Sequence, residues 1–273
     1  REYKGDAIIK VDAHAVIPED FVSKNVRVLE TGEYICGGQR PNIIDKPTPF
    51  KETLLLAESS MFGSSIASYR NNPGKTYVKS LFHAAYRREV FEKVGFFNEE
   101  LVRTEDNEIH YRMRKAGYKL CFDPDIISYQ YTRSSLKAML KQKYANGYWI
   151  GKTSKVCPKC LSIYHFVPFA FVSAIIASGS VIGATGLAEC IKKRHNHTLG
   201  KGISALRKVT VVLTTVMWVL YALMASGMAA VSAFKAEDKR NITNACLPVL
   251  FLLLHLSYGI GTIAGLMDKS KRG

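Results

Sequence analysis

Two hydrophobic patterns alternate along the chain up to about residue 160. Short apolar runs predict buried strands, and stretches with an apolar residue at every third or fourth position predict amphipathic helices. The expected strands are 7–11, 34–36, 77–83, 119–122 and 126–131, and the expected helices are 19–30, 50–67, 87–94, 105–116 and 134–148. Strands that alternate with helices predict an α/β domain.

Three long apolar stretches follow, at about 163–187, 209–234 and 246–267. Each is long enough to cross a hydrocarbon layer of about 30 Å as a helix. We therefore expect an α/β domain over residues 1–160 and a membrane region with about three hydrophobic helices over residues 161–273. His255 lies inside the third stretch, where an ionisable residue is a candidate for function. A neutral histidine bonded to a neighbouring helix is the simpler alternative.

The charges beside these stretches leave the orientation open. If all three stretches span, one side of the membrane collects the cations before residue 163 and those of 235–240. The other side collects the cations of 192–208 and of the C-terminal tail. The two sides are similarly basic, so the positive-inside rule does not decide between them. An arrangement in which one stretch does not span also remains open.

The formal net charge of the chain is +15. The basic residues do not form a patch interleaved with aromatic residues, which argues against a nucleic-acid partner. Cations that flank membrane segments and bind anionic lipid headgroups explain the charge, and a phosphorylated substrate would also suit it. Cys157 and Cys160 form a CxxC pair, but no second pair completes a zinc site. Spectator thiols are the expectation, and a metal or redox role is the alternative.

The strongest cluster of candidate chemical groups is Thr104, Glu105 and Asp106. Thr104 is placed to cap the helix that follows, and the helix dipole favours carboxylates in its first turn. A carboxylate held in this way stays ionised near neutral pH. It is therefore suited to remove a proton from a hydroxyl group as a general base. The alternative is that both carboxylates only cap the helix.

Segment 82–97, followed by Thr104-Glu105-Asp106 and the Gly117 region, resembles the acceptor half of family 2 glycosyltransferases. The order and spacing agree: a strand, a helix that ends in Val-Gly-Phe-Phe at 94–97, and then the Glu-Asp pair. The whole chain is similar to the succinoglycan-biosynthesis type of this family, including 11–15 near the front and 255–261 in the last apolar stretch. The resemblance implies an α/β, GT-A-like domain followed by α-helical transmembrane segments, and an inverting glycosyltransferase activity.

The resemblance also implies roles for individual residues. Asp106 would be the base for the acceptor hydroxyl, with Glu105 as its support, and Arg112 would brace the helix. The metal-binding Asp-x-Asp of the family falls on 12–14, so Asp12 and His14 are the expected ligands of a divalent cation, Mg²⁺ or Mn²⁺. The second position is His14 instead of Asp, and imidazole favours Mn²⁺.

The expected substrate-binding residues lie in two segments. His83 and Arg87 belong to the acceptor-site segment. Gln142, Tyr148 and Trp149 occupy the place of the Gln-x-x-Arg-Trp motif of processive members. The Arg of that motif is absent, so we expect the transfer of a single sugar instead of polymer extension. Tyr148 and Trp149 would either stack on an acceptor sugar or belong to an aromatic belt at the membrane interface.

The implied protein is a hexosyltransferase-type enzyme in the plasma membrane, multi-pass, with its catalytic domain in the cytoplasm. Its expected partners are a nucleotide-sugar donor, a lipid-linked (polyprenyl diphosphate) glycan acceptor of exopolysaccharide synthesis, and membrane lipids. Nothing before Asp12 corresponds to the nucleotide-binding βαβ unit of the family. We therefore expect an N-terminally truncated chain that does not turn over alone. A processive synthase and a non-catalytic membrane scaffold derived from a transferase are the alternatives.

Overall fold

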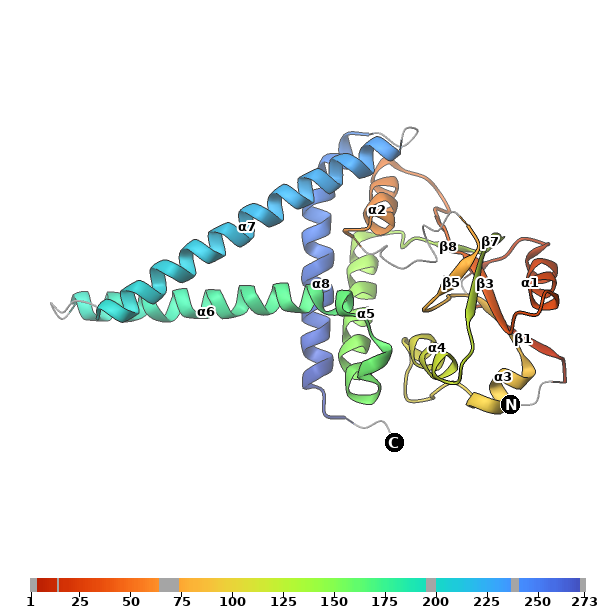
Figure 1. Cartoon of the computed structure of the whole chain (residues 1–273). Helices are drawn as coiled ribbons and strands as arrows, with labels where there is room; N and C mark the ends of the chain where they lie inside the picture. The colour runs from red at the N-terminus through yellow and green to blue at the C-terminus, as the bar shows by residue number, and fades with distance from the viewer. Residues whose placement is uncertain (1–3, 14, 64–73, 195–199, 237–240, 271–273) are drawn as a thin grey trace.

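The computed structural model describes residues 4–13, 15–63, 74–194, 200–236 and 241–270. An α/β domain comes first, and three long helices follow it (Figure 1). The strands are β1 (Ala7–Lys10), β2 (Ala15–Val16), β3 (Ile35–Gln39), β4 (Asn42–Ile43), β5 (Thr76–Val78), β6 (Ala84–Arg87), β7 (Leu120–Ile127) and β8 (Tyr129–Tyr131). The α-helices are α1 (Phe21–Glu30), α2 (Pro49–Ser59), α3 (Arg88–Val94), α4 (Glu105–Lys115), α5 (Leu136–Val156), α6 (Val167–Arg194), α7 (Lys201–Lys235) and α8 (Leu247–Met267). Short 3₁₀ turns lie at η2 (Pro158–Cys160), η3 (Ile163–Phe166) and η5 (Ile242–Cys246).

A five-stranded sheet in the order β1-β6-β3-β7-β5 forms the centre of the domain. Strands β3 and β7 run parallel, and the other neighbours run antiparallel. A second sheet, β2-β8-β4, is built from the segments that follow β1, β7 and β3 in the chain. The short connections between the two sheets therefore gather in one place, and Asp12 and Ser128 lie on two of them.

Helices cover both faces of the large sheet, as the expected α/β pattern requires. On β6, Ala84 and Tyr86 pack into the cluster that includes Ile109 and Met113 of α4. Ala85, between them, packs on the other face with Phe21 of α1. This alternation is what a strand buried on both faces requires.

Three sequence-based boundaries need correction. The expected strand 77–83 is wrong, because β5 ends at Val78 and the next strand, β6, begins at Ala84 and pairs with β1 and β3 on its two edges. The expected strands 119–122 and 126–131 become β7 and β8, which are separated at Ser128. Helix α2 ends at Ser59, where Ser60 turns to an extended conformation, and residues 64–67 of the expected helix lie outside the described residues.

Helix α5 is longer than expected and packs closely along α8. A Cβ atom added at Gly147 would lie 2.0 Å from the carbonyl oxygen of Tyr258, and one added at Gly265 would lie 2.0 Å from that of Tyr148. Small residues let helix backbones approach this closely. The second half of α5 is therefore held by α8 and not by the sheet.

Three helical segments are long and apolar enough to cross a membrane, in agreement with the expectation: Ile163–Arg194, Lys201–Lys235 and Ile242–Met267. Within them, Nδ1 of His255 lies 2.9 Å from the hydroxyl of Tyr221 on α7, and its Nε2 lies 2.7 Å from the carbonyl oxygen of Phe62. The alternative of a histidine bonded to a neighbouring helix is therefore confirmed.

Candidate active site

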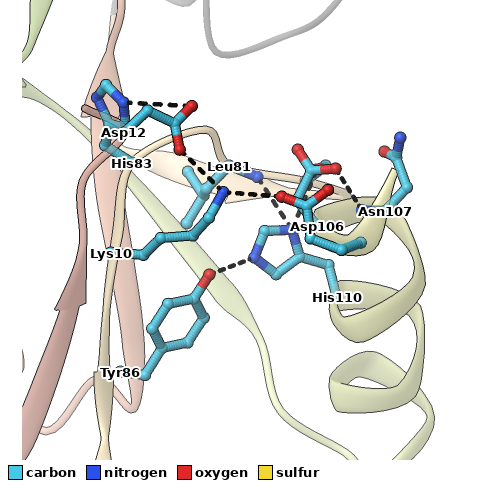
Figure 2. A network of polar contacts seen from close by, with 10 residues as sticks. Lys10, Asp12, Leu81, His83, Tyr86, Asp106, Asn107 and His110 are labelled. Atoms are coloured by element: carbon cyan, nitrogen blue, oxygen red, sulfur yellow. Dashed lines mark hydrogen bonds and ion pairs between the residues drawn. The ribbon is translucent and has the colours of Figure 1, made fainter. Parts of the chain in front are cut away.

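Asp12 and His83 meet where β1 leaves the large sheet. Lys10 pairs with Ala84 in the ladder between β1 and β6, which brings the residues just beyond these strand ends together. Oδ2 of Asp12 lies 4.0 Å from Nε2 of His83 (Figure 2). Nδ1 of the buried His83 lies 2.8 Å from the hydroxyl of Ser128, which fixes the ring.

Lys10 joins this end of the sheet to the N-terminus of α4. Its ammonium group lies 3.4 Å from Oδ1 of Asp12 and 3.1 Å from Oε1 of Glu105 (Figure 2). Burial alone lowers the pKa of Lys10, but the nearby carboxylates of Asp106, Glu105 and Asp12 more than offset this and raise it. Lys10 is therefore a fixed positive charge among three carboxylates.

Asp106 lies in the first turn of α4 and accepts a hydrogen bond from the backbone N–H of Asn107 at 2.8 Å. Burial, and then the charge of Glu105, raise the pKa of Asp106 to about 6, although Lys10 and the Asn107 N–H oppose the shift. The hydrogen bond favours the charged form, as expected, but desolvation outweighs it. Asp106 is nevertheless mostly ionised at pH 7 and is a better proton acceptor than an ordinary aspartate.

Thr104 does not cap α4 with its side chain, contrary to the expectation. Its hydroxyl instead contacts the hydroxyl of Thr153 on α5, and both residues are buried. Arg103 also donates a hydrogen bond to Asn146 of α5, at 3.1 Å. The start of α4 is thus tied to α5, and the carboxylate pair has no side-chain cap beside it.

A buried pair, His110 of α4 and Tyr86 of β6, joins the helix to the large sheet. His110 lies one turn after Asp106, and its Nε2 lies 2.8 Å from the hydroxyl of Tyr86. The backbone N–H of Leu81 approaches Nδ1, so Nδ1 accepts and Nε2 donates to Tyr86. Burial, followed by the charges of Lys10 and Arg114, lowers the pKa of His110 to about 3, so this ring is neutral.

The donor set for a divalent cation is partial. Asp12 supplies a carboxylate and His83 an imidazole, and both donor types suit Mn²⁺. Within the described ranges, no group of three or more His, Cys, Asp or Glu side chains is placed to hold a metal ion. His14, the other expected ligand, lies outside the described residues. Asp12 and His83 therefore fit an ion whose remaining ligands come from a bound diphosphate and water.

A model of the family described as "Glycosyl transferase family group 2" matches residues 7–261. The chain belongs to this family. It is 27% identical over 145 residues to Succinoglycan biosynthesis protein ExoA of Rhizobium meliloti (strain 1021), and the match covers 52% of this chain and 43% of that protein.

Two further relatives are similar over comparable regions. The chain is 24% identical over 180 residues to dolichyl N-acetyl-alpha-D-glucosaminyl phosphate 3-beta-D-2,3-diacetamido-2,3-dideoxy-beta-D-glucuronosyltransferase of Methanococcus voltae, covering 63% of this chain and 54% of that protein. It is 29% identical over 133 residues to O-antigen chain rhamnosyltransferase RfbN of Salmonella typhimurium, covering 46% and 42%. The chain thus spans about half the length of the curated relatives it matches.

Two of the residues predicted to bind substrate, Arg87 and Trp149, instead hold parts of the fold together. Arg87 lies at the far end of β6 from His83 and donates hydrogen bonds to the carbonyl oxygens of Glu33 and Leu29, at 3.0 and 2.7 Å. Its predicted contact with substrate does not fit this placement, because the guanidinium group holds the end of α1. Trp149 is only 8% exposed, so its ring is not available to stack on a sugar.

Tyr148 and Gln142 complete the α5 set. The hydroxyl of Tyr148 is bonded to Asp268 beyond the end of α8. Oε1 of Gln142 is buried and has no hydrogen-bond partner among the described residues. A substrate-binding role for Gln142 therefore stays a prediction.

Arg112 braces α4, as expected. It binds both carboxylate oxygens of Glu108, at 2.7 and 2.8 Å, and donates to the carbonyl oxygens of Val94 and Phe96 at 2.6 and 2.7 Å. It thus ties the Val-Gly-Phe-Phe segment to the helix that carries Asp106.

Sequence reasoning missed Lys10 and His110. Lys10 is the one charged residue within the apolar run 7–11, which was a signal that its side chain meets a partner. His110 follows Asp106 at the i+4 spacing that places two residues on one face of a helix.

Proposed function

We propose that this chain carries the catalytic base and acceptor side of an inverting glycosyltransferase. The enzyme moves a hexose from a nucleotide-sugar donor to a lipid-linked glycan acceptor in the synthesis of exopolysaccharide or another cell-surface polysaccharide. The observation that carries the proposal is Asp106: a carboxylate at a helix N-terminus with its pKa raised to about 6, next to the Lys10–Asp12 cluster. The names of the relatives, which include a succinoglycan biosynthesis protein and a rhamnosyltransferase, support the same reaction class.

The reaction proposed at this site is a single displacement. Asp106 takes the proton of the acceptor hydroxyl while the oxygen of that hydroxyl forms a bond to the anomeric carbon of the donor. The bond between that carbon and the diphosphate breaks, and the nucleoside diphosphate leaves with the electron pair. Attack opposite the leaving group inverts the anomeric carbon. Lys10 keeps Glu105 and Asp12 in place and limits the repulsion among the carboxylates around Asp106.

We further propose that Asp12 and His83 hold a divalent cation, which offsets the charge of the leaving diphosphate when it is bound. Binding of Mn²⁺ is measured by electron paramagnetic resonance as loss of the free-ion signal, with and without nucleoside diphosphate. Asp12→Asn is expected to abolish this loss, and Asp20→Asn, at the N-terminus of α1 and paired with Lys24, is expected to leave it unchanged. Equal Mn²⁺ binding by both variants would remove Asp12 as a ligand.

We also propose that the enzyme is a multi-pass protein of the plasma membrane with its α/β domain on the cytoplasmic side, where a nucleotide-sugar donor would be available. Three helical segments that are long and apolar enough to cross a membrane support the membrane location. Membrane lipids and a polyprenyl-diphosphate carrier are then the partners on the helix side of the domain. Two contacts, Arg103 with Asn146 and Thr104 with Thr153, support a location of the site near the membrane, because they tie the start of α4 to the helix that packs on α8.

The test is release of nucleoside diphosphate by membranes that carry the full-length protein, with a panel of nucleotide-sugars and a lipid-linked acceptor. Acceptor-dependent release is expected, and Asp106→Asn is expected to reduce it by about two to four orders of magnitude, the usual contribution of a general base. Asp125→Asn, an exposed aspartate on β7, is the matched control and is expected to retain activity. Release that Asp106→Asn leaves unchanged would refute the base assignment. No release with any donor would favour the scaffold alternative.

A further inference from the structure

Helix α8 is in contact with helices α2 and α5 of the preceding domain from end to end. Just before its N-terminus, Asn244 accepts a hydrogen bond from Thr53 of α2 at 2.7 Å. At its centre, the hydroxyl of Ser257 donates to the carbonyl oxygen of Leu140 on α5 at 2.8 Å. Beyond its C-terminus, Lys155 of α5 donates to the carbonyl oxygen of Asp268 at 2.8 Å. A helix that crossed a bilayer would leave the domain at one end and not follow it from end to end.

The partner helix α5 carries charges at the depth where hydrocarbon would have to be. Lys141 is exposed and directly follows Leu140, which meets Ser257 at the centre of α8. Lys137, one turn earlier, is exposed as well. On the protein side of α5, Lys143 forms a buried ion pair with Glu58 of α2, at 3.6 Å. Cations at the centre of a bilayer are strongly disfavoured, so a spanning α8 with α5 beside it is a poor arrangement.

The opposite face of α8 is a purely aliphatic stripe. Val249, Ile260 and Met267 are 59%, 49% and 73% exposed. The partly exposed Leu253, Leu256 and Ile263 lie between them at the spacing that keeps one face of a helix. Because protein covers the opposite face, only this stripe is left to meet lipid, and a helix that lies in the plane of a membrane surface likewise puts a single apolar face into lipid.

Helices α6 and α7 leave α8 in the direction away from the domain. Near its start, α6 crosses α8 at Gly259, where an added Cβ would lie 2.4 Å from the carbonyl oxygen of Pro168. In Figure 1, α6 then runs across α8 and away from it, and α7 returns to the N-terminal end of α8. The most apolar parts of α6 and α7 are almost entirely exposed, whereas the most apolar part of α8 is partly covered by protein. The aliphatic stripe of α8 is thus continuous with two helices that need lipid around them.

From these contacts we propose that α8 does not cross the bilayer. It lies in the membrane surface with the aliphatic stripe in lipid, and α6 and α7 alone form a two-span hairpin. The C-terminal tail is then on the same side of the membrane as the α/β domain. The platform of α5 and α8 holds the start of α4 at the lipid surface, where a lipid-linked acceptor would be presented to Asp106.

The charges agree with this topology, an argument that rests on the proposed function because it takes the domain side as cytoplasmic. With α8 in the membrane plane, Lys269, Lys271 and Arg272 join the domain side, together with the cations of 235–240. A third span would instead add these tail residues to the far side, which already holds the cations of 192–208. The positive-inside rule favours the arrangement with more short-loop cations on the cytoplasmic side.

Cysteine labelling from each side of the membrane tests the proposal without any turnover, so its outcome is independent of the proposed function. In the full-length protein, the exposed Cys190 and Cys246 and the half-buried Cys157 are first replaced by serine, which leaves only the buried Cys36, Cys121 and Cys160 among the native cysteines of these 273 residues. Single cysteines are then introduced as Ser270→Cys in the tail, Glu92→Cys on the domain and Gly200→Cys just before α7. A membrane-impermeant maleimide is applied to spheroplasts and, separately, to inverted vesicles.

Ser270→Cys is expected to react from the same side as Glu92→Cys, and to lose its reaction when the reagent is confined to the side where Gly200→Cys reacts. Reaction of Ser270→Cys from the Gly200→Cys side would overturn the proposal. A second measurement places nitroxide labels at Val249→Cys, Leu256→Cys and Met267→Cys in the same background and determines their depth in lipid. An in-plane α8 gives three similar, shallow depths, and a deepest value at position 256 between two shallow ones would refute it.

Discussion

Lys10 is the residue whose removal best tests the electrostatics of the site. Lys10→Met keeps most of the length of the side chain and deletes its charge. The change removes the contacts at 3.1 Å to Glu105 and at 3.4 Å to Asp12, both from side chains that are less than one quarter exposed. The charge of Lys10 also opposes the rise in the pKa of Asp106. Without it, burial and the charge of Glu105 are expected to raise this pKa further.

The size of the effect is taken from the shift that a nearby opposite charge usually causes. A cation within about 4–6 Å lowers the pKa of a carboxyl group by about 1–3. Taking the low end, Lys10→Met moves the pKa of Asp106 from about 6 to about 7. At pH 6 the ionised fraction then falls from about one half to about one tenth, so kcat/KM falls about fivefold. At pH 8.5 both proteins are almost fully ionised at this position, and the difference becomes small.

The assay is the pH dependence of kcat/KM for release of nucleoside diphosphate between pH 5 and 9. The acid limb of the wild-type profile is expected near pH 6, because the base must be deprotonated, and in Lys10→Met it moves to higher pH. The matched control is Lys24→Met, which deletes a lysine paired with Asp20 at 2.8 Å on α1 and is expected to leave the limb in place. An unchanged limb in Lys10→Met, or a limb at lower pH, would show that Lys10 does not act on the base.

Two further predictions concern stability. The pKa of Asp106 in the folded protein is about 6, above the ordinary value of 3.8. The folded state therefore loses stability as the pH rises from about 4 to about 6, because Asp106 ionises at a buried position. Asp106→Asn is therefore expected to be more stable than wild type at pH 7.5, by up to about 3 kcal/mol, and to lose this advantage near pH 4; thermal unfolding in detergent measures both, and a lower melting temperature at pH 7.5 would contradict the buried-charge argument. Gly265→Leu places a side chain where a Cβ alone would lie 2.0 Å from the carbonyl oxygen of Tyr148, so it should cost about 1–3 kcal/mol by overpacking, whereas Gly227→Leu on α7, with nothing within 4 Å of its Cβ position, should cost little. Equal melting temperatures for these two glycine variants would show that α5 and α8 do not pack as closely as described.

The sequence predicted the features that depend on local pattern. The alternating apolar runs gave the α/β class, and the three long apolar stretches gave the helices that are able to span a membrane. The position of Glu105 and Asp106 at the start of a helix was also predicted, because it follows from the helical period downstream and from Gly117 at its end. Each of these properties is set by residues within a few positions of one another.

Tertiary structure decided what depends on residues far apart in the chain. The pKa of Asp106 rises chiefly because the packed surroundings desolvate it, with the charge of Glu105 adding to the rise, and a local dipole argument does not contain this burial. Lys10 joins the site only because β1 pairs with β6, and Arg87 leaves it for the same reason, since it lies at the other end of that ladder. The role of α8 depends on which of its faces α5 covers, and a hydropathy pattern gives the same value whether an apolar face meets lipid or protein.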